Sequence, residues 1–305
     1  MSLLIPLDVT CAVDISCRLG ESPVWSAQER ALYWVDIPEG RLHRWSHAGG
    51  EHRGPHEGGL RRQWQLPAAI GSLALRERGG LLLALKTGLH TFDPDTGALE
   101  RLCHPEADRP ELRLNDGKVS PEGRFWVGSM DDGPERQPLG SLWRLDADHR
   151  CMRVVTGQRV PNGLAWSPDG RTMYRADTRA LTVWRHDYDP ASGALGEAEV
   201  FVVMQPDWGR PDGAAVDAEG CYWNAGVGAG RLNRFSPAGE LMGFVPLPVS
   251  HPTMPCFGGP ELRTLYVTSM RNGVAEELLA RHPLSGSVLA LAAPVAGMPV
   301  AAYRG

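Results

Sequence analysis

Four oxygen-bearing side chains occur at one position of an internal repeat in this chain. Each lies five residues before the Ser or Asp of a polar turn, and the turn residues are Ser26, Ser120, Ser167 and Asp217; the side chains are Glu21, Asn115, Asn162 and Asp212. Carboxylate and amide oxygens without sulfur or imidazole form a hard ligand set, suited to calcium, magnesium or manganese more than to structural zinc. If the repeats close into a ring, these side chains converge on one divalent cation.

The same residues also have a simpler reading as turn formers. Asn and Asp tolerate turn conformations beside Gly, as in Asn115-Asp116-Gly117, Pro161-Asn162-Gly163 and Pro211-Asp212-Gly213. Taken singly, each of these motifs predicts a turn. Because four residues share one phase and Glu21 is a poor turn former, the pattern favours a metal centre.

Two further repeats carry no oxygen side chain at this phase. They place Gly71 and the region near Met254 there, which predicts that one sector of the ring stays open for substrate. An incomplete coordination shell lets a metal polarise a carbonyl group or lower the pKa of a bound water. The sequence contains no G-x-S-x-G elbow and no H-E-x-x-H helix, so serine hydrolase and zinc protease chemistry are not indicated.

Short apolar runs recur along the chain and predict the elements that position these residues. Six runs read as strands at a spacing of about 43 to 49 residues: 32–37, 81–85, 125–128, 173–176, 222–225 and 265–268. Each is flanked by further strand-like segments, which gives about four antiparallel strands per repeat. Repeats of this length are typical of propeller blades. We therefore predict an all-β fold, a six-bladed β-propeller that spans residues 1–305 as a single domain.

Aromatic residues and turn motifs agree with this architecture. We expect a group of aromatic side chains to fill the blade cores: Trp34, Trp126, Tyr174, Trp223 and Tyr266. The near copies at 92–97 and 188–193 predict hairpin turns between outer strands. The six cysteines show no C-x-x-C spacing, so we expect free thiols.

Composition limits the partners of the protein. A net charge of −5 with 31 Lys and Arg gives no basic surface for nucleic acid. No apolar stretch approaches the roughly 20 residues that span a bilayer. The segment 1–23 has no positively charged stretch followed by an apolar run. This argues against a signal peptide and predicts a cytoplasmic location. We expect a monomer or a weak homo-oligomer.

Several motifs together resemble the regucalcin (senescence marker protein) and gluconolactonase family of six-bladed propellers, and the resemblance runs essentially from end to end. The motifs are Leu19-Gly20-Glu21-Ser22-Pro23-Val24-Trp25, Arg113-Leu114-Asn115-Asp116-Gly117-Lys118, Pro161-Asn162-Gly163-Leu164, Pro211-Asp212-Gly213 and Cys256-Phe257-Gly258-Gly259. The resemblance implies that Glu21, Asn162 and Asp212 bind one divalent cation. It also implies that Arg113 and Asn115 hold a sugar lactone, with Asn115 near the metal. The guanidinium of Arg113 offers up to five donors in a fixed fork for the ring and hydroxyl oxygens.

One segment departs from the regucalcin pattern. After Gly128-Ser129-Met130, where regucalcin has a Glu pair, this chain has Asp131 and Asp132. These shorter carboxylates reach less far, so contact with substrate hydroxyls through Asp131 or Asp132 changes the expected sugar preference. The segment 130–133, together with 138–142, is more similar to bacterial aldonolactonases.

The reaction indicated is hydrolysis of an aldono-lactone such as arabinono-, galactono- or gluconolactone. The metal draws charge from the lactone carbonyl and water is the nucleophile. Asp212 is the candidate general base, but a carboxylate committed to a metal is a poor base, so a metal-bound hydroxide is an equally open route. The cation is calcium, zinc, manganese, magnesium or ferrous iron.

Two other functions are also compatible with the sequence. Hydrolysis of organophosphates or aryl esters is one, although such sites tend to be more apolar, and Arg113 and Asn115 favour a polyhydroxylated substrate. The other is a calcium-binding propeller without catalytic turnover. In that case, replacing Asp212 would weaken ion binding only.

Overall fold

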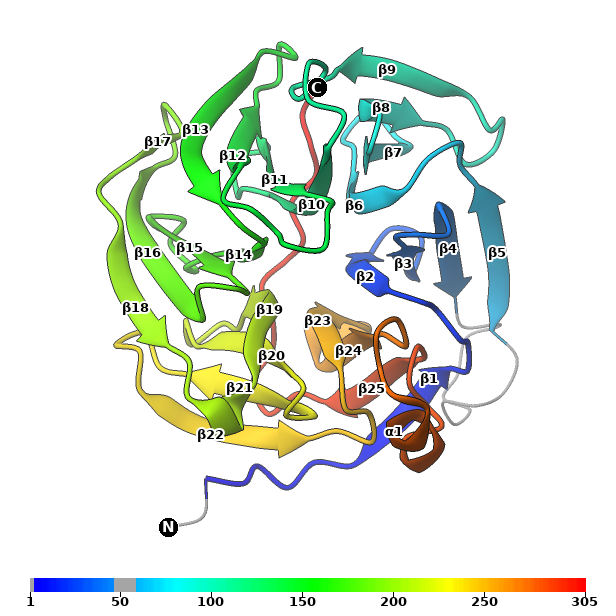
Figure 1. The fold of residues 1–305 in the computed structure, drawn as a ribbon, viewed down its shortest axis with the longest axis vertical. Coiled ribbons are helices and arrows are strands. Elements are labelled where there is room, and N and C mark those ends of the chain that lie inside the picture. The colour runs from blue at the N-terminus through cyan, green and yellow to red at the C-terminus, as the bar shows by residue number, and fades with distance from the viewer. Residues whose placement is uncertain (1–2, 47–58) are drawn as a thin grey trace.

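A computed structural model describes residues 3–46 and 59–305 and shows a ring of β-sheets around a central channel (Figure 1). The regular secondary structure of the described chain is almost entirely β-strand. Its α-helix is α1 (Glu276–Arg281), and the 3-10 helices are η1 (Pro206–Trp208) and η2 (Pro260–Leu262). None of the described helices is long and apolar enough to cross a membrane.

Six antiparallel sheets form the blades, which we number in chain order. Within each blade, the strands are given from the innermost to the outermost. Blade 1 contains β2 (Gly20–Ser26), β3 (Ala31–Asp36), β4 (Arg41–Ser46) and β5 (Leu60–Gln65). Blade 2 contains β6 (Ile70–Leu75), β7 (Leu81–Leu85), β8 (Gly88–Phe92) and β9 (Leu99–Cys103). Blade 3 contains β10 (Leu112–Val119), β11 (Phe125–Asp131), β12 (Gly140–Leu145) and β13 (Cys151–Gln158).

The remaining blades follow the same order. Blade 4 contains β14 (Pro161–Trp166), β15 (Thr172–Asp177), β16 (Thr182–Asp189) and β18 (Glu199–Val203), with the short β17 (Ala194–Leu195) also paired to β16. Blade 5 contains β19 (Arg210–Val216), β20 (Tyr222–Val227), β21 (Arg231–Phe235) and β22 (Leu241–Pro246). Blade 6 contains β23 (Pro252–Gly258), β24 (Thr264–Ser269), β25 (Val288–Ala292) and β1 (Val9–Val13).

The predicted fold is confirmed. Each of the six apolar runs is the second strand of a blade, and each blade is an antiparallel sheet built on four strands. The motif at 92–97 joins β8 to β9, and the motif at 188–193 joins β16 to β17, so both are hairpin turns. All six cysteines are free thiols in the structure.

The ring closes because strands from the two ends of the chain pair in the same blade. The N-terminal strand β1 pairs with the C-terminal strand β25, with Val9 opposite Leu291 and Thr10 opposite Ala290. Blade 6 thus takes its outer strand from the beginning of the sequence. This pairing covers the edge of β25, and β1 becomes the outer edge strand of blade 6.

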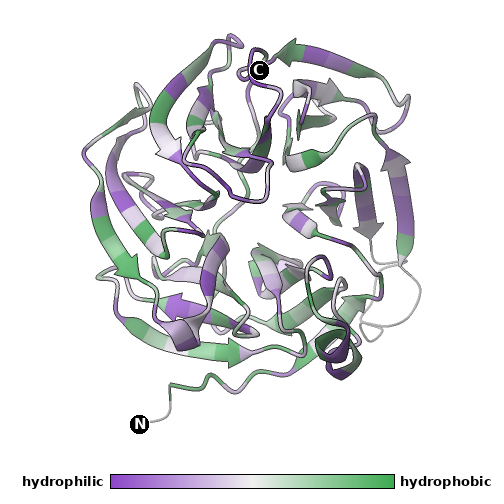
Figure 2. Cartoon of the chain, in the orientation of Figure 1, coloured by the Kyte–Doolittle hydropathy of each residue, from purple (hydrophilic) through white to green (hydrophobic). Residues whose placement is uncertain are grey.

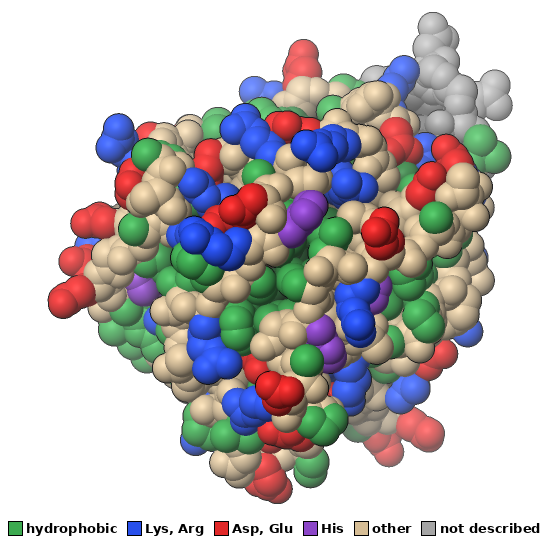
Figure 3. All heavy atoms as spheres, turned by 90° about the horizontal axis from the view of Figure 1, so that it is seen from above, with side chains coloured by type: hydrophobic (Ala, Val, Ile, Leu, Met, Phe, Trp, Pro, Cys, Tyr) green, Lys and Arg blue, Asp and Glu red, His purple; other side chains and the backbone are tan. Residues whose placement is uncertain are grey.

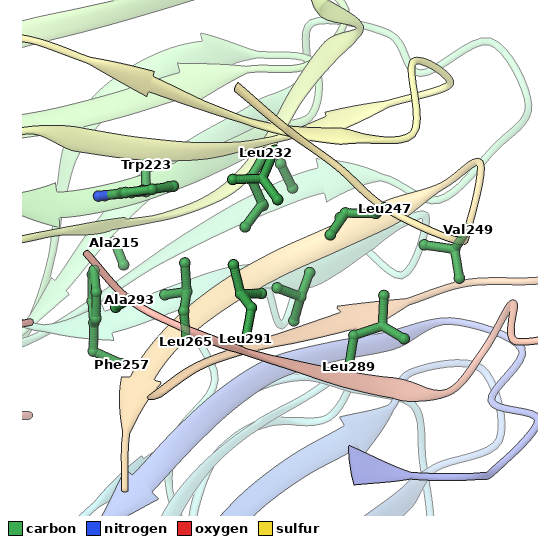
Figure 4. Packing of buried hydrophobic residues seen from close by; sticks show 13 residues of the cluster. Ala215, Trp223, Leu232, Leu247, Val249, Phe257, Leu265, Leu289, Leu291 and Ala293 are labelled. Atoms are coloured by element: carbon green, nitrogen blue, oxygen red, sulfur yellow. The ribbon is translucent and has the colours of Figure 1, made fainter. Parts of the chain in front are cut away.

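The hydrophobic core lies between the blades. Six clusters of buried side chains occupy the six interfaces between neighbouring blades. Figure 4 shows the cluster in which Trp223 and Leu232 of blade 5 face Phe257, Leu265 and Leu291 of blade 6. The aromatic residues predicted for the core are all buried. Figure 2 shows hydrophobic and hydrophilic residues mixed along the outer strands, which lie at the rim of the ring.

A register shift interrupts the innermost strand of every blade at the same place. The shifts fall at Glu21/Val24, Ile70/Ser72, Leu114/Gly117, Asn162/Ala165, Pro211/Ala214 and Pro252/Pro255. A bulge of this kind bends the strand and redirects a side chain. The repeated offset seen in the sequence therefore corresponds to a repeated bulge at one end of the channel.

Candidate metal and substrate site

The bulges place the four predicted ligand residues on four innermost strands around the channel. Glu21 and Asn162 begin the shifts in β2 and β14, while Asn115 and Asp212 lie within the shifts in β10 and β19. All four side chains are buried. Because equivalent ends of innermost strands meet at one mouth of a propeller, the structure brings these residues together from blades 1, 3, 4 and 5.

Hydrogen bonds link the two amide ligands across blades 3, 4 and 5. The Nδ2 of Asn115 donates to the Oδ1 of Asn162 at 3.4 Å and to the carbonyl of Pro161 at 3.0 Å. The Nδ2 of Asn162 donates to the Oγ1 of Thr178 at 2.7 Å, and this hydroxyl donates to the carbonyl of Pro211 at 2.7 Å. These bonds engage the amide nitrogens, and the Oδ1 of Asn162, which accepts one long hydrogen bond, has a second lone pair for a ligand.

Three carboxyl groups share the channel, because Asp116 lies close to the predicted pair Glu21 and Asp212. Burial raises the pKa of Asp212 to about 8, and the charge of Asp116 adds to this effect. Burial also raises the pKa of Glu21 well above its ordinary value, with the charge of Asp212 as the next cause. Among the described residues, none of the three carboxyl groups forms a salt bridge. The buried acidic groups therefore have no direct ion-pair partner among the described residues, although the charges of Arg113 and Lys118 act on them from a greater distance.

This environment fits a hard divalent cation. The donors are carboxylate and amide oxygens, and a cation would stabilise the ionised carboxylates against the burial, and the mutual repulsion, that raise the two pKa values. Within residues 3–46 and 59–305, no three His, Cys, Asp or Glu side chains form a metal-binding group by themselves. The expected ligand set does not depend on such a group, because two of its four members are the amides of Asn115 and Asn162.

Arg113 lies beside the ligand residues with its guanidinium held on two sides. Its Nε donates to the Oδ1 of Asp132 at 3.0 Å, and its Nη1 donates to the Oδ1 of Asn115 at 2.7 Å and to the carbonyl of Leu114 at 3.0 Å. Its Nη2 makes no hydrogen bond with any residue in the described part of the chain. That nitrogen is the donor left for a ligand, as expected for a residue that binds substrate oxygens.

The two aspartates of the divergent segment have different surroundings. The carboxylate of Asp132 forms salt bridges with three basic side chains. Besides Arg113, it contacts Lys86 at 2.9 Å and Arg136 at 3.5 Å. Asp131 instead accepts hydrogen bonds from the backbone N–H groups of Gly133 at 2.9 Å and Gln137 at 2.8 Å. Those hydrogen bonds lower the pKa of Asp131 and fix the loop that follows β11. Substrate contact by either aspartate stays a prediction.

Sequence reasoning missed Asp116, Lys86 and Arg136 as parts of this site. Asp116 stands inside the motif 113–118, but beside Gly117 it reads as a turn former. Lys86 belongs to the turn between β7 and β8, 46 residues from Asp132, and no local pattern connects the two. Gly71, at one of the two repeat positions without an oxygen ligand, packs against β10. A Cβ added to Gly71 would lie 2.3 Å from the carbonyl oxygen of Leu114.

Fold and site together define a six-bladed β-propeller with a buried, oxygen-lined site at one end of its channel. The family model for the SMP-30/gluconolactonase/LRE-like region matches residues 19–271. The chain belongs to this family, which confirms the resemblance predicted from its motifs.

Individual relatives match over most of their length. A 6-deoxy-6-sulfogluconolactonase from Pseudomonas putida is 40% identical over 97% of this chain and 98% of that protein. A pentonolactonase from Haloferax volcanii is 37% identical over 86% of this chain and 85% of that protein. The crystal structure of a calcium-binding protein, regucalcin, from Agrobacterium tumefaciens superposes with a TM-score of 0.92 at 29% identity and covers both chains completely. Two of these three relatives are thus named as lactonases, and the third is named as a calcium-binding protein.

Proposed function

We propose that this protein hydrolyses an aldono-lactone to the open sugar acid with the help of one divalent cation. Glu21, Asn162 and Asp212, with Asn115 beside them, are the proposed cation ligands. One observation carries the proposal: buried carboxyl groups that form no salt bridge with any described residue stand next to a guanidinium that has an unused donor. The names of the relatives support the same reaction class.

The residues of this chain have separate proposed roles. A bound divalent cation polarises a carbonyl group and lowers the pKa of a nearby water. Arg113 donates from its Nη2 to an oxygen of the lactone, and Asn115 orients the guanidinium through the 2.7 Å hydrogen bond. We propose that Asp212 accepts a proton from the attacking water and returns it to the ring oxygen of the lactone as the ring C–O bond breaks. Asp132 holds Arg113 in place, and we propose that Asp131 and Asp132 border the sugar hydroxyls.

The charge around Arg113 bears on the choice of sugar. Lys86, Arg113 and Arg136 surround the single carboxylate of Asp132, which leaves an excess of positive charge on this side of the site. A lactone with an anionic substituent would gain from this charge. The substrate panel therefore includes arabinono-, xylono-, galactono- and gluconolactone, and 6-deoxy-6-sulfogluconolactone as an anionic member.

The test removes bound metal with a chelator and restores one metal at a time. Acid release from each lactone is followed at constant pH against the spontaneous rate, with calcium, magnesium, manganese, zinc and ferrous iron in turn. The proposal expects acceleration that depends on the cation and saturates with one lactone or a small group. Spontaneous rates throughout, with calcium still bound tightly, would instead establish a binding protein without turnover.

A matched pair of variants separates the site from the rest of the surface. Asp212→Asn should abolish turnover, whereas Asp207→Asn, which changes a carboxylate with 76% of its side chain exposed, should leave turnover unchanged. Paraoxon and phenyl acetate added to the panel test the organophosphate and aryl-ester alternative, and faster hydrolysis of either than of every lactone would favour it. A single domain over residues 1–305, a cytoplasmic location and a monomeric or weakly oligomeric state stay predictions.

A further inference from the structure

A second cavity lies further along the central channel, beyond the candidate site. It has a volume of about 360 Å³, and the innermost strands of all six blades contribute to its wall. One apolar side chain from each blade illustrates this: Val24, Leu73, Val119, Trp166, Val216 and Phe257. None of the four proposed cation ligands lines this cavity. The wall of this cavity is therefore distinct from the oxygen-lined ligand set, although it is built by the same six innermost strands.

The C-terminal segment forms the outer wall of this cavity. Residues 298–301 line it, and Figure 1 shows the red C-terminal segment crossing the ring. The segment is fixed at both ends, because Gly297 donates its N–H to the carbonyl of Leu262 at 2.9 Å and Tyr303 donates its N–H to that of Leu75 at 2.8 Å. Between these anchors, residues 298–302 make no main-chain hydrogen bond with the described chain. These residues, 298–302, form a short strap over the cavity that main-chain hydrogen bonds hold to the described chain only at its two ends.

Lys118 is the one cationic side chain in the cavity wall. Its side chain extends from β10 of blade 3, and its Nζ donates to the carbonyl of Ala214 on β19 of blade 5. The residue retains accessible surface although it lies deep in the channel, so this surface faces the interior space. An ammonium has three donors, and Ala214 is the only hydrogen-bond acceptor that the described residues provide for them. At least one donor is available to a ligand on the cavity side.

Size and chemistry restrict the ligand class. A cavity of about 150 Å³ holds one benzene, so about 360 Å³ has room for roughly a dozen heavy atoms. A sugar lactone does not suit this compartment, because an apolar wall would leave its hydroxyl groups without partners. We propose that the cavity is a second binding site for a small apolar molecule with one terminal carbonyl oxygen, which accepts a hydrogen bond from Lys118.

The first test locates the ligand in the intact protein. We would label the methionine methyl groups with ¹³C and titrate with 2-acetylnaphthalene, an apolar bicycle with one ketone. Met254 and Met298 line the cavity, whereas Met130 pairs with Arg113 beside the candidate site. The proposal expects saturable shifts of the Met254 and Met298 signals with no shift of Met130. An absence of saturable shifts, or a shift of Met130 without the other two, would overturn it.

The second test concerns the role of Lys118. Its matched probe is 2-ethylnaphthalene, which has a similar shape but no acceptor. In the wild-type protein the ketone should bind about five- to tenfold more tightly than the hydrocarbon, as one added hydrogen bond predicts. Lys118→Met should bind both probes equally, provided that its circular dichroism matches the wild type. Equal affinities in the wild-type protein, which need no variant, would also refute the proposal.

Discussion

Lowering the pH from about 8 to about 6 should weaken divalent-cation binding steeply. Burial raises the pKa of Asp212 to about 8 and that of Glu21 well above its ordinary value. A cation binds the ionised carboxylates, so protons on these groups compete with it. Each group that must lose a proton lowers the apparent affinity about tenfold per pH unit below its pKa.

The magnitude follows from the number of protonated groups. If Asp212 alone carries a proton, two pH units weaken binding about 100-fold, which equals about 2.7 kcal/mol. If Glu21 is protonated as well, the loss approaches about 10⁴-fold, because the interacting pair then releases two protons. Binding at pH 6 should accordingly release between about one and two protons per cation.

Titration calorimetry in buffers with different ionisation enthalpies measures this proton release directly. Asp212→Asn should reduce the release by about one proton and weaken the pH dependence. Asp207→Asn is the control, since that side chain is 76% exposed, and it should behave as the wild type does. An affinity that does not change between pH 6 and 8, with no proton release, would refute the assignment of Glu21 and Asp212 as cation ligands.

Three further predictions follow from the fold and the site. In metal-free protein, the raised pKa values of Glu21 and Asp212 mean that the folded state binds more protons than the unfolded state, so stability falls from about pH 4 to about pH 8; the melting temperature at pH 6 should exceed that at pH 8, and added manganese should reverse this order. Asp132→Asn weakens a hydrogen bond that holds Arg113, so KM for the lactone should rise about five- to tenfold with little change in kcat, and an effect confined to kcat would contradict this role. Trp223→Ala leaves a cavity between blades 5 and 6, so urea unfolding should show a loss of about 3 to 5 kcal/mol, and a loss below about 1 kcal/mol would contradict the packing described.

The fold was predictable from the sequence because the blades repeat. Apolar runs at regular spacing mark the second strand of each blade, and each sits between two hydrophobic interfaces. The phase of Glu21, Asn115, Asn162 and Asp212 was also readable, since counting back from a turn locates the same point on each innermost strand. What the count does not reveal is the bulge that redirects these side chains, because a register shift depends on the partner strand.

Contacts between distant segments account for what sequence reasoning missed. Lys86 reaches Asp132 only because blades 2 and 3 are neighbours in the ring, whereas Arg136 lies four residues after Asp132 in the same loop. The N-terminal strand joins blade 6, and the C-terminal strap crosses the channel, although neither segment carries a repeat motif.

The surface charge agrees with what the composition of the sequence predicts. Figure 3 shows Lys and Arg interspersed with Asp and Glu on the face in view, and no basic patch dominates that face.

The central claim is that Glu21, Asn162 and Asp212 hold one divalent cation at the mouth of the channel. Crystals of the protein soaked in a manganese salt would test it most directly, because manganese gives an anomalous diffraction signal. We predict one strong peak within about 2.5 Å of oxygen atoms of all three residues, and its absence in Asp212→Asn crystals. A peak elsewhere in the molecule, or none at this position in the wild-type crystals, would contradict the account.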